Sequence, residues 1–189
     1  PMALGILFAS GQLYLPQDAK IYAEGELTLG GELKGTPGSG IRLKTVRDMD
    51  FDYRIIPADE SVSAGVAAFR GQAVSSLIEL NEIFDSNSYK ETAFGFEKGS
   101  DTGGILDITM LKGQEKTKRA LLISAAGFHN ILLMGSQGSG KTMAGKILSG
   151  ILPRLDREEL SDVYSLTELV EGESASINDI RPVRIIEPG

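Results

Sequence analysis

The stretch Gly135-Ser136-Gln137-Gly138-Ser139-Gly140-Lys141-Thr142 decides how we interpret the second half of the chain. It fits the pattern G-x-x-x-x-G-K-[ST], in which glycines let the backbone bend tightly and several N–H groups point at one centre. Such a nest at the start of a helix binds the phosphates of a nucleotide. The stretch therefore predicts a nucleotide site to which all eight residues contribute.

The two last residues of the stretch have side chains suited to a charged nucleotide. Lys141 can reach the β- and γ-phosphates and stabilise their charge, which would make it the catalytic cation, and the Thr142 hydroxyl can bind Mg²⁺. We therefore expect ATP and Mg²⁺ as cofactors. The alternative interpretation is a glycine-rich turn that happens to precede a lysine.

The flanking sequence fits the nucleotide interpretation. Asn130-Ile131-Leu132-Leu133-Met134 is a short apolar run typical of a buried parallel strand. Residues 142–152 place apolar side chains at helical spacing, at Met143, Ile147, Leu148 and Ile151. The order predicted is strand, loop and helix, which is the arrangement that phosphate binding requires.

The first part of the chain, residues 1–84, is predicted to be one α/β unit. Residues 2–10 are apolar and predict a buried helix that ends at Gly11. Residues 21–33 predict a pair of strands joined by the turn Gly30-Gly31, and residues 53–57 a strand that ends at a proline. The run 41–46 is compatible with either a helix or a strand.

A serine-capped amphipathic helix is predicted from Ser75-Ser76 onwards, with Leu77, Leu80, Ile83 and Phe84 on one face. Residues 85–104 are polar and glycine-rich and predict a linker. A second unit then occupies 105–189, with a helix over 114–126 that ends at Gly127. The fold class predicted for the whole chain is α/β.

Composition limits the classes of protein that remain. The chain has 189 residues, a formal net charge of −7 and no cysteine, so a disulfide framework and a cysteine-based metal site are excluded. A net negative charge argues against broad affinity for nucleic acid, although a local basic surface remains compatible with it. No apolar run approaches the roughly 18 residues of a membrane span. We expect a cytoplasmic protein without a membrane partner.

Three further stretches carry a family resemblance. They are Leu111 to Leu121, Ala125 to Met134 together with the phosphate loop, and Gly150 to Leu155. Together they resemble the opening of the AAA+ module in the magnesium-chelatase-like ComM/YifB competence-protein family of bacteria. The earlier run Gly25 to Leu33 is similar to that family's N-terminal domain, which is related to the Lon protease domain.

The resemblance implies more than the motif does alone. It implies a partial Lon-type (ribosomal S5-like) α/β domain followed by the N-terminal part of a P-loop AAA+ parallel-sheet domain, in a chain truncated at both ends. It places Gln114 near the adenine, where the alternative is an exposed polar residue at a helix start. It also implies that the intact protein is a ring-forming, DNA-directed ATPase, with branch migration in competence as its role. Two alternatives remain open: a magnesium-chelatase-type motor subunit, and a nucleotide-binding assembly module without hydrolysis.

Several features depart from the family or bear on activity. Gln137 stands where the family usually has proline, and Arg184 lacks the Pro-His-His element that usually follows. No apolar run ending in Asp-Glu follows Thr142, so whether this chain hydrolyses ATP is undecided. The pair Asp59-Glu60 lies upstream of the loop, in the other unit.

The remaining polar groups are expected to have structural or solvent-facing roles. The single histidine, His129, precedes an apolar run and is expected to be structural, because no triad pattern accompanies it. Residues 156–180 are acidic and predict a solvated helical face rather than a metal site. The cluster Lys112, Lys116, Lys118 and Arg119 predicts a solvated helix face, with a DNA contact as the alternative.

Overall fold

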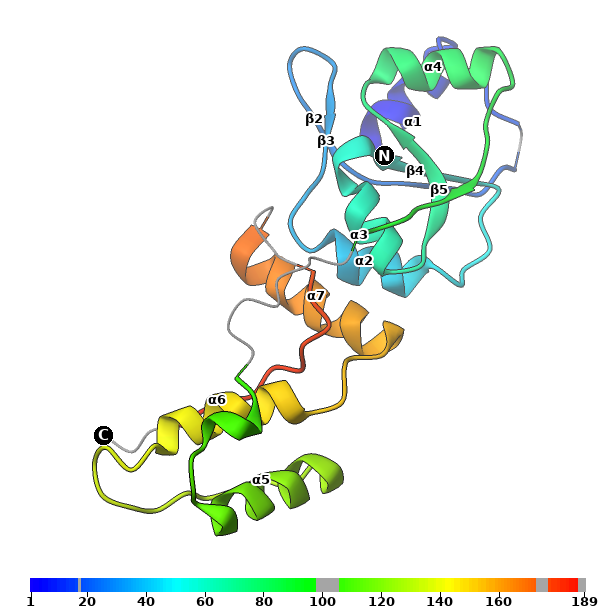
Figure 1. Cartoon of the computed structure of the whole chain (residues 1–189). Helices are drawn as coiled ribbons and strands as arrows, with labels where there is room; N and C mark the ends of the chain where they lie inside the picture. Colours follow the sequence, from blue (N-terminus) through cyan, green and yellow to red (C-terminus); the bar gives the residue numbers. More distant parts are fainter. Residues whose placement is uncertain (17, 98–105, 173–176, 187–189) are drawn as a thin grey trace. The chain divides into compact units, whose positions relative to one another are not determined.

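The computed structural model describes residues 1–16, 18–97, 106–172 and 177–186, and the chain divides into two compact units. The first unit contains residues 1–97 together with 157–177, and the second contains 98–156 together with 178–189. The mixed α/β class predicted from the sequence is confirmed. Figure 1 shows the elements of both units.

A four-stranded sheet forms the centre of the first unit, in the order β1-β4-β5-β6. The strands are β1 (Ile21–Ala23), β4 (Tyr53–Pro57), β5 (Arg70–Val74) and β6 (Thr92–Ala93). Strand β4 pairs in parallel with both β1 and β5, and β6 adds an antiparallel edge. The strand predicted over 53–57 is confirmed as β4.

Helices cover both faces of this sheet because successive residues of β4 point to opposite sides. Ile56 packs on one face with Leu43 of α2 (Ser39–Val46) and Ala64 of α3 (Ser61–Val66). Ile55 packs on the other face with Leu80 of α4 (Leu77–Asp85). Helix α1 (Met2–Ala9) borders that second core. A parallel strand buried on both faces in this way reads as a continuous apolar run.

Local signals in the sequence predict several elements correctly. The hairpin at Gly30-Gly31 forms between β2 (Glu26–Leu27) and β3 (Leu33–Lys34). The strand predicted before this turn is divided, because Ile21–Ala23 forms β1 in the four-stranded sheet. Helix α4 begins with the predicted serine cap, where Ser76 Oγ accepts a hydrogen bond from Glu79 N at 3.2 Å, and Glu79 Oε2 accepts one from Ser75 N at 2.7 Å. The undecided run 41–46 is helical, as part of α2.

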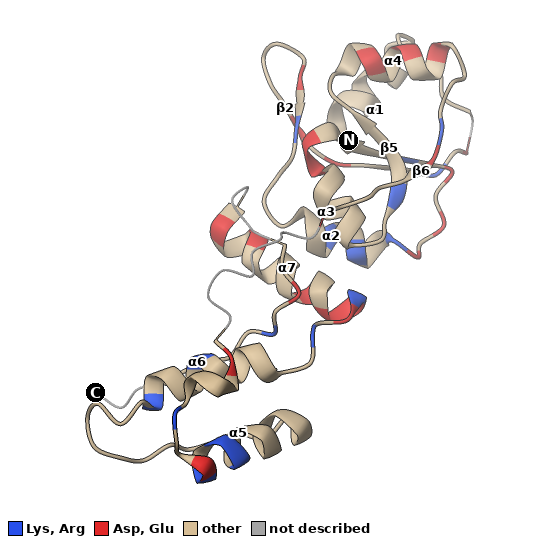
Figure 2. Ribbon diagram, viewed as in Figure 1, with Lys and Arg blue, Asp and Glu red and all other residues tan. Residues whose placement is uncertain are grey.

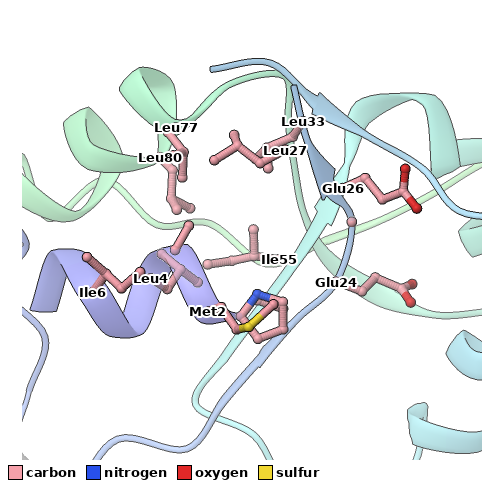
Figure 3. A pocket seen from close by; sticks show the side chains of 14 residues that line it. Met2, Leu4, Ile6, Glu24, Glu26, Leu27, Leu33, Ile55, Leu77 and Leu80 are labelled. Atoms are coloured by element: carbon pink, nitrogen blue, oxygen red, sulfur yellow. The ribbon is translucent and has the colours of Figure 1, made fainter. Parts of the chain in front are cut away.

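Helix α1 forms where the sequence predicts it, but it is not buried. Met2 and Ile6 are 86% and 67% exposed, and no residue of the helix is fully buried. An apolar cavity of about 490 Å³ lies beside it, between β4, the β2–β3 hairpin and α4. Figure 3 shows leucines of α1, α4 and the hairpin around Ile55, while the carboxylates of Glu24 and Glu26 point away from them. The prediction of a buried helix over 2–10 is therefore wrong, because this unit covers only one side of α1.

The predicted linker over 85–104 is packed in its first part. β6 pairs with β5, and Tyr89 OH accepts a hydrogen bond from Arg54 N at 2.9 Å. Its residues 98–104 lie outside the described residues. The rest of the first unit comes from further along the chain, because α7 (Arg157–Glu171) packs on α2 and α3. The sequence interpretation places this helix in the second domain. The boundaries 1–84, 85–104 and 105–189 stay a prediction.

The second unit is built on two packed helices, α5 (Glu115–Gly127) and α6 (Lys141–Ile151), with the short 3-10 helix η2 (Ile108–Met110) before them. Both predicted helices are confirmed. Leu121 and Ala125 of α5 pack against Ala144, Ile147 and Leu148 of α6. Helix α5 ends one residue later than predicted, with Phe128 as a left-handed cap at φ 52°.

The strand predicted over 130–134 does not form. Ile131 and Leu133 pack against the core of the second unit, but Leu132 and Met134 are 83% and 86% exposed. A strand needs a hydrogen-bonded neighbour, and the described part of this unit contains no strand to pair with this segment.

A buried carboxylate pair lies on the α2 side of the first unit. Glu60, 3% exposed, accepts a hydrogen bond from Thr36 N at 2.8 Å, and Arg42 NH2 lies 3.6 Å from it. Arg42 Nε donates to Glu24 at 2.6 Å, so the same guanidinium group forms ion pairs with both carboxylates. One oxygen of Glu24 and one of Glu60 have no hydrogen-bond partner among the described residues. Burial, and then the charge of Glu24, raise the pKa of Glu60 to about 8.

The raised pKa of Glu60 predicts that the stability of the protein decreases as pH rises. An unfolded glutamate ionises near 4.5, whereas folded Glu60 keeps its proton up to about 8. Between these values folding takes up a proton, so the free energy of unfolding decreases as pH rises through the window and levels off above it. In Glu60→Gln this decrease should disappear, so the stability of the variant relative to wild type should increase as pH rises through the same window.

Urea unfolding of both proteins from about pH 4.5 to pH 8.5 measures the difference, because this range spans the two pKa values. The exposed Glu26→Gln variant is the control and should keep the wild-type pH dependence. An identical pH dependence in Glu60→Gln and wild type would contradict the raised pKa.

Candidate phosphate-binding site

The loop 135–140 has a backbone that glycine permits and other residues rarely adopt. Gly138 and Gly140 have φ angles of 78° and 83°, in the left-handed region. A Cβ on Gly135 would lie 2.9 Å from Ser139 Oγ, and Ser139 N donates to Ser136 O at 3.3 Å to close the turn. The glycines thus allow a compact loop immediately before a helix.

Helix α6 begins at Lys141, with Gly140 as its N-cap residue. The first N–H groups of a helix have no partner within the helix, and the helix dipole is positive at this end. No acidic residue lies in the first turn of α6 to neutralise that end. The geometry and charge therefore suit an anion such as a phosphate group.

The side chain of Lys141 folds back over the loop, which is predicted to bind a nucleotide together with this lysine. Its Nζ donates to Gly135 O at 2.9 Å and to Ser136 O at 2.8 Å. These exposed hydrogen bonds hold the ammonium group against the loop. Thr142 follows in the first turn of α6. Its binding of Mg²⁺ stays a prediction.

Gln114 lies next to this loop although it is far from Gly140 in the sequence. Its Nε2 is 3.7 Å from the position that a Cβ on Gly140 would occupy. Gln114 is the N-cap residue of α5 and has a left-handed backbone, with φ 53°. A non-glycine residue in this region is uncommon and often lies at a functional site. The structure thus brings the predicted adenine-side residue to the loop; its contact with adenine stays a prediction.

His129 and Asp59, which the sequence analysis singled out, both make hydrogen bonds that support the fold. His129 N donates to Ser124 O at 2.9 Å, Ser124 Oγ donates to His129 O at 2.6 Å, and the imidazole lies against Gly127. Asp59 accepts from Gly35 N with both carboxylate oxygens, at 2.9 and 3.1 Å. Asp59 and its neighbour Glu60 thus support the first unit.

The segment 178–186 packs on the second unit, which the sequence did not indicate. Arg181 stacks over the ring of Phe128 at 5.1 Å and donates to Pro153 O at 3.3 Å. Val183 joins the core, and Ile185 lies against Gly145 of α6. Only the alternation of Val183 and Ile185 with Arg184 could have suggested this packing.

Charge is unevenly divided between the two units. The described residues of the second unit hold nine Lys and Arg but four Asp and Glu, whereas those of the first hold nine Lys and Arg but nineteen Asp and Glu. Figure 2 shows the contrast between basic α5 and acidic α4 and α7. In the predicted basic cluster, Lys118 pairs with Glu115 at 3.0 Å. Lys112, Lys116 and Arg119 have no ion pair among the described residues.

The described residues contain neither a metal-ligand cluster nor a membrane-spanning helix. No group of three or more His, Cys, Asp or Glu is arranged to hold a metal ion within the part of the chain that the structure describes. In the same residues, every helix is too short or too polar to cross a membrane.

Residues 107–187, which include the phosphate loop and α7, match a protein-family model described as magnesium chelatase, subunit ChlI. Most of the chain is similar to several curated proteins. The competence protein ComM of Haemophilus influenzae is 32% identical over 181 residues, covering 92% of this chain and 35% of ComM. Proteins named YifB from Salmonella typhimurium and Escherichia coli are 33% and 32% identical, each covering 92% of this chain and 34% of YifB.

The chain therefore spans about a third of the length of these relatives. Its similarity to them covers 92% of the chain, and the family model matches residues 107–187, which belong partly to each of the two compact units. The sequence resemblance and these matches agree, and the chain is a ComM/YifB-like member of the magnesium-chelatase family.

Proposed function

We propose that the chain binds ATP together with Mg²⁺ at Gly135–Thr142. The observation that carries the proposal is the left-handed backbone of Gly138 and Gly140 directly before the positive end of α6. In the bound state the loop N–H groups and Lys141 would hold the phosphates, and Thr142 would hold Mg²⁺. The ion would neutralise part of the phosphate charge.

Lys141 is placed to bind phosphate because its side chain already makes hydrogen bonds within the loop. Its ammonium group already lies over the loop, where it donates to two backbone carbonyls. A phosphate is a stronger acceptor than a neutral carbonyl, because both partners are then charged. Lys141 would therefore exchange the carbonyls of Gly135 and Ser136 for phosphate oxygens without a large movement of α6.

For the chain of 189 residues we propose ATP binding without turnover. Hydrolysis requires an acidic residue that positions the attacking water beside the phosphates. The acidic pair Asp59-Glu60 holds backbone N–H groups of the first unit instead. No apolar run ending in Asp-Glu follows Thr142 in the sequence.

We propose DNA as the substrate on which the intact protein acts, as a ring-forming motor in the cytoplasm that drives branch migration during competence. The supporting observations are the similarity to ComM and the excess of basic side chains in the phosphate-loop unit. Basic groups without acidic partners bind phosphate backbones by releasing counterions. Lys112, Lys116 and Arg119 fit this role.

A magnesium-chelatase-type motor is the second candidate. The family model that matches 107–187 favours it, because its description names a chelatase subunit. Against it stands the similarity to ComM and YifB over 92% of the chain, which includes the first unit. Co-purification with DNA rather than with a tetrapyrrole-binding subunit would separate the two.

Removing the ammonium group of Lys141 should weaken ATP binding. A hydrogen bond between charged groups contributes about 1.5–3 kcal/mol, so Lys141→Ala should raise the dissociation constant roughly 10- to 100-fold. Titration with a fluorescent ATP analogue in Mg²⁺ measures this. Lys146→Ala removes another cation from the same helix and is the matched control. Equal affinity in Lys141→Ala and wild type would refute the site, and steady-state hydrolysis by the wild-type chain would refute binding without turnover.

If the second unit binds DNA, removing cations from that unit should weaken DNA binding and its dependence on salt, whereas removing cations from the first unit should not. Lys116→Ala with Arg119→Ala should weaken duplex binding and lower the slope of log affinity against log salt by about 0.9 for each phosphate that the variant no longer neutralises. Fluorescence anisotropy at several salt concentrations measures both. The control, Lys34→Ala with Lys90→Ala, removes two cations from the first unit. Equal effects in the two double variants, or no DNA binding even at low salt, would argue against DNA and for the chelatase-type candidate.

A further inference from the structure

Phe128 has a backbone conformation that its residue type rarely adopts. It is the C-terminal cap residue of α5, with φ 52° and ψ 37°, in the left-handed region. At this place in a helix the usual residue is glycine, because a Cβ disfavours the left-handed region, and a bulky side chain there is an outlier. The backbone at Phe128 is therefore strained, and the rest of the second unit has to offset this strain.

The phenylalanine ring contributes little packing in return. Phe128 is 61% exposed, whereas Leu121 and Ala125 of the same helix are 0% and 5% exposed. The cap does not need the ring, since Phe128 N donates to Ser124 O and Ser124 Oγ donates to His129 O at 2.6 Å. A glycine would make the same backbone contacts without strain. Strained residues cluster at functional sites, and packing does not account for the exposed ring.

A guanidinium group lies over this ring. Arg181 Cζ is 5.1 Å from the centroid of the Phe128 ring, within the range of a cation–π contact. The contact joins two segments of the second unit that are far apart in the sequence. Phe128 remains 61% exposed although Arg181 covers part of its ring, so ring surface is left open to a further flat group.

The segment that carries Arg181 is fixed on the second unit, so the guanidinium group is held over the ring. Arg181 Nε donates to Pro153 O at 3.3 Å, just beyond the end of α6. Two residues further along, Val183 packs against the core that α5 and α6 form. Figure 1 shows this segment, in red, running beside α6. The ring of Phe128 and the guanidinium group of Arg181 thus form a preorganised pair.

The charge around this pair suits a polyanion. The described residues of the second unit hold nine Lys and Arg but four Asp and Glu. One of these acids, Asp179, lies two residues from Arg181 in the sequence, and its carboxylate pairs with Arg154 at 3.1 Å. Single-stranded nucleic acid meets both requirements of the pair, because its backbone is anionic and its bases are flat and aromatic.

An unpaired base suits the pair better than a base inside a duplex. Bases within a duplex are stacked on their neighbours, so a side chain reaches their faces only where the stack opens. The bases of a single strand can be splayed out, and aromatic side chains and Arg guanidinium planes are the groups on which such bases stack. Both kinds of group are present in the pair of Phe128 and Arg181.

We propose that Phe128 and Arg181 form a stacking platform for an unpaired base of single-stranded DNA, an inference that rests on the proposed DNA substrate and goes beyond it. The base stacks on the exposed surface of the Phe128 ring, while Arg181 holds the ring from its other contact and adds positive charge for the backbone. Stacking of a base releases no counterions. The ring therefore adds to the affinity without adding to its salt dependence, unlike the cations of α5.

Replacing Phe128 by glycine tests the platform, because stability and binding should then change in opposite directions. Phe128→Gly relieves the left-handed strain, so the urea midpoint of unfolding should rise. The variant also lacks the ring, so its affinity for a single-stranded oligothymidine should fall roughly 5- to 150-fold, which corresponds to about 1–3 kcal/mol of stacking per base. The slope of log affinity against log salt should stay as in wild type. Fluorescence anisotropy at several salt concentrations measures affinity and slope.

Two further variants keep the test specific to an aromatic ring at this position. Phe128→Tyr keeps a ring on which a base can stack, and it should retain the wild-type affinity for the oligothymidine. Tyr14→Ala removes a ring that is 80% exposed on the first unit, and it should leave the affinity unchanged. A loss of affinity in Tyr14→Ala as large as in Phe128→Gly would refute the platform.

The outcomes separate the platform from the proposed DNA substrate. If wild type binds duplex DNA only, or if Phe128→Gly binds the oligothymidine as tightly as wild type does, the platform is refuted while the DNA proposal stands. If wild type binds neither form of DNA at low salt, both are refuted. A lower affinity with a smaller salt slope would mean lost phosphate contacts, which also refutes stacking. If Phe128→Gly fails to fold, Phe128→Asn decides, because asparagine also adopts the left-handed region and has no ring.

Discussion

Strand β4 is the constraint on which the first unit depends. Among the described strands of this sheet, it alone has parallel partners on both sides, so its backbone fixes the positions of β1 and β5. Its neighbouring residues Ile55 and Ile56 enter two different cores, one under α4 and one under α2 and α3. The surface that receives α7 is the outer side of α2 and α3. There the Glu168 carboxylate of α7 accepts hydrogen bonds from Ser39 and Gly40 of α2 and from Ser63 of α3.

The elements that the sequence predicts correctly are those whose signals lie within a few neighbouring residues. A serine cap, a Gly-Gly turn and helical spacing act within a few residues, and α4, the β2–β3 hairpin, α5 and α6 all form where these signals occur. The failures have long-range causes. The run 130–134 has the right composition for a strand but lacks a neighbour among the described residues, and α1 is apolar but covered on one side only. Helix α7 shows helical periodicity, yet nothing near it in the sequence indicates that Glu168 contacts Gly40.

In the candidate site, too, the sequence predicts the features that depend on neighbouring residues but not those that depend on long-range packing. The backbone of Gly138 and Gly140 and the start of α6 follow from the motif, since both depend on glycine and on a helix immediately after it. The approach of Gln114 to Gly140 depends on the packing of α5 against α6, which only the folded chain provides. The contacts of Arg181 and Ile185 also depend on folding. Thus the chemistry of the loop is readable from the sequence, but the residues that surround it are not.

The two helices on either side of residues 152–156 are held by different kinds of contact. Helix α6 is fixed by apolar packing of Ile147 and Leu148, which is insensitive to direction and tolerates small rotations. Helix α7 buries Leu160 and Tyr164 and is also held by the Glu168 carboxylate, whose hydrogen bonds to Ser39 and Gly40 lose strength steeply when distance or angle changes.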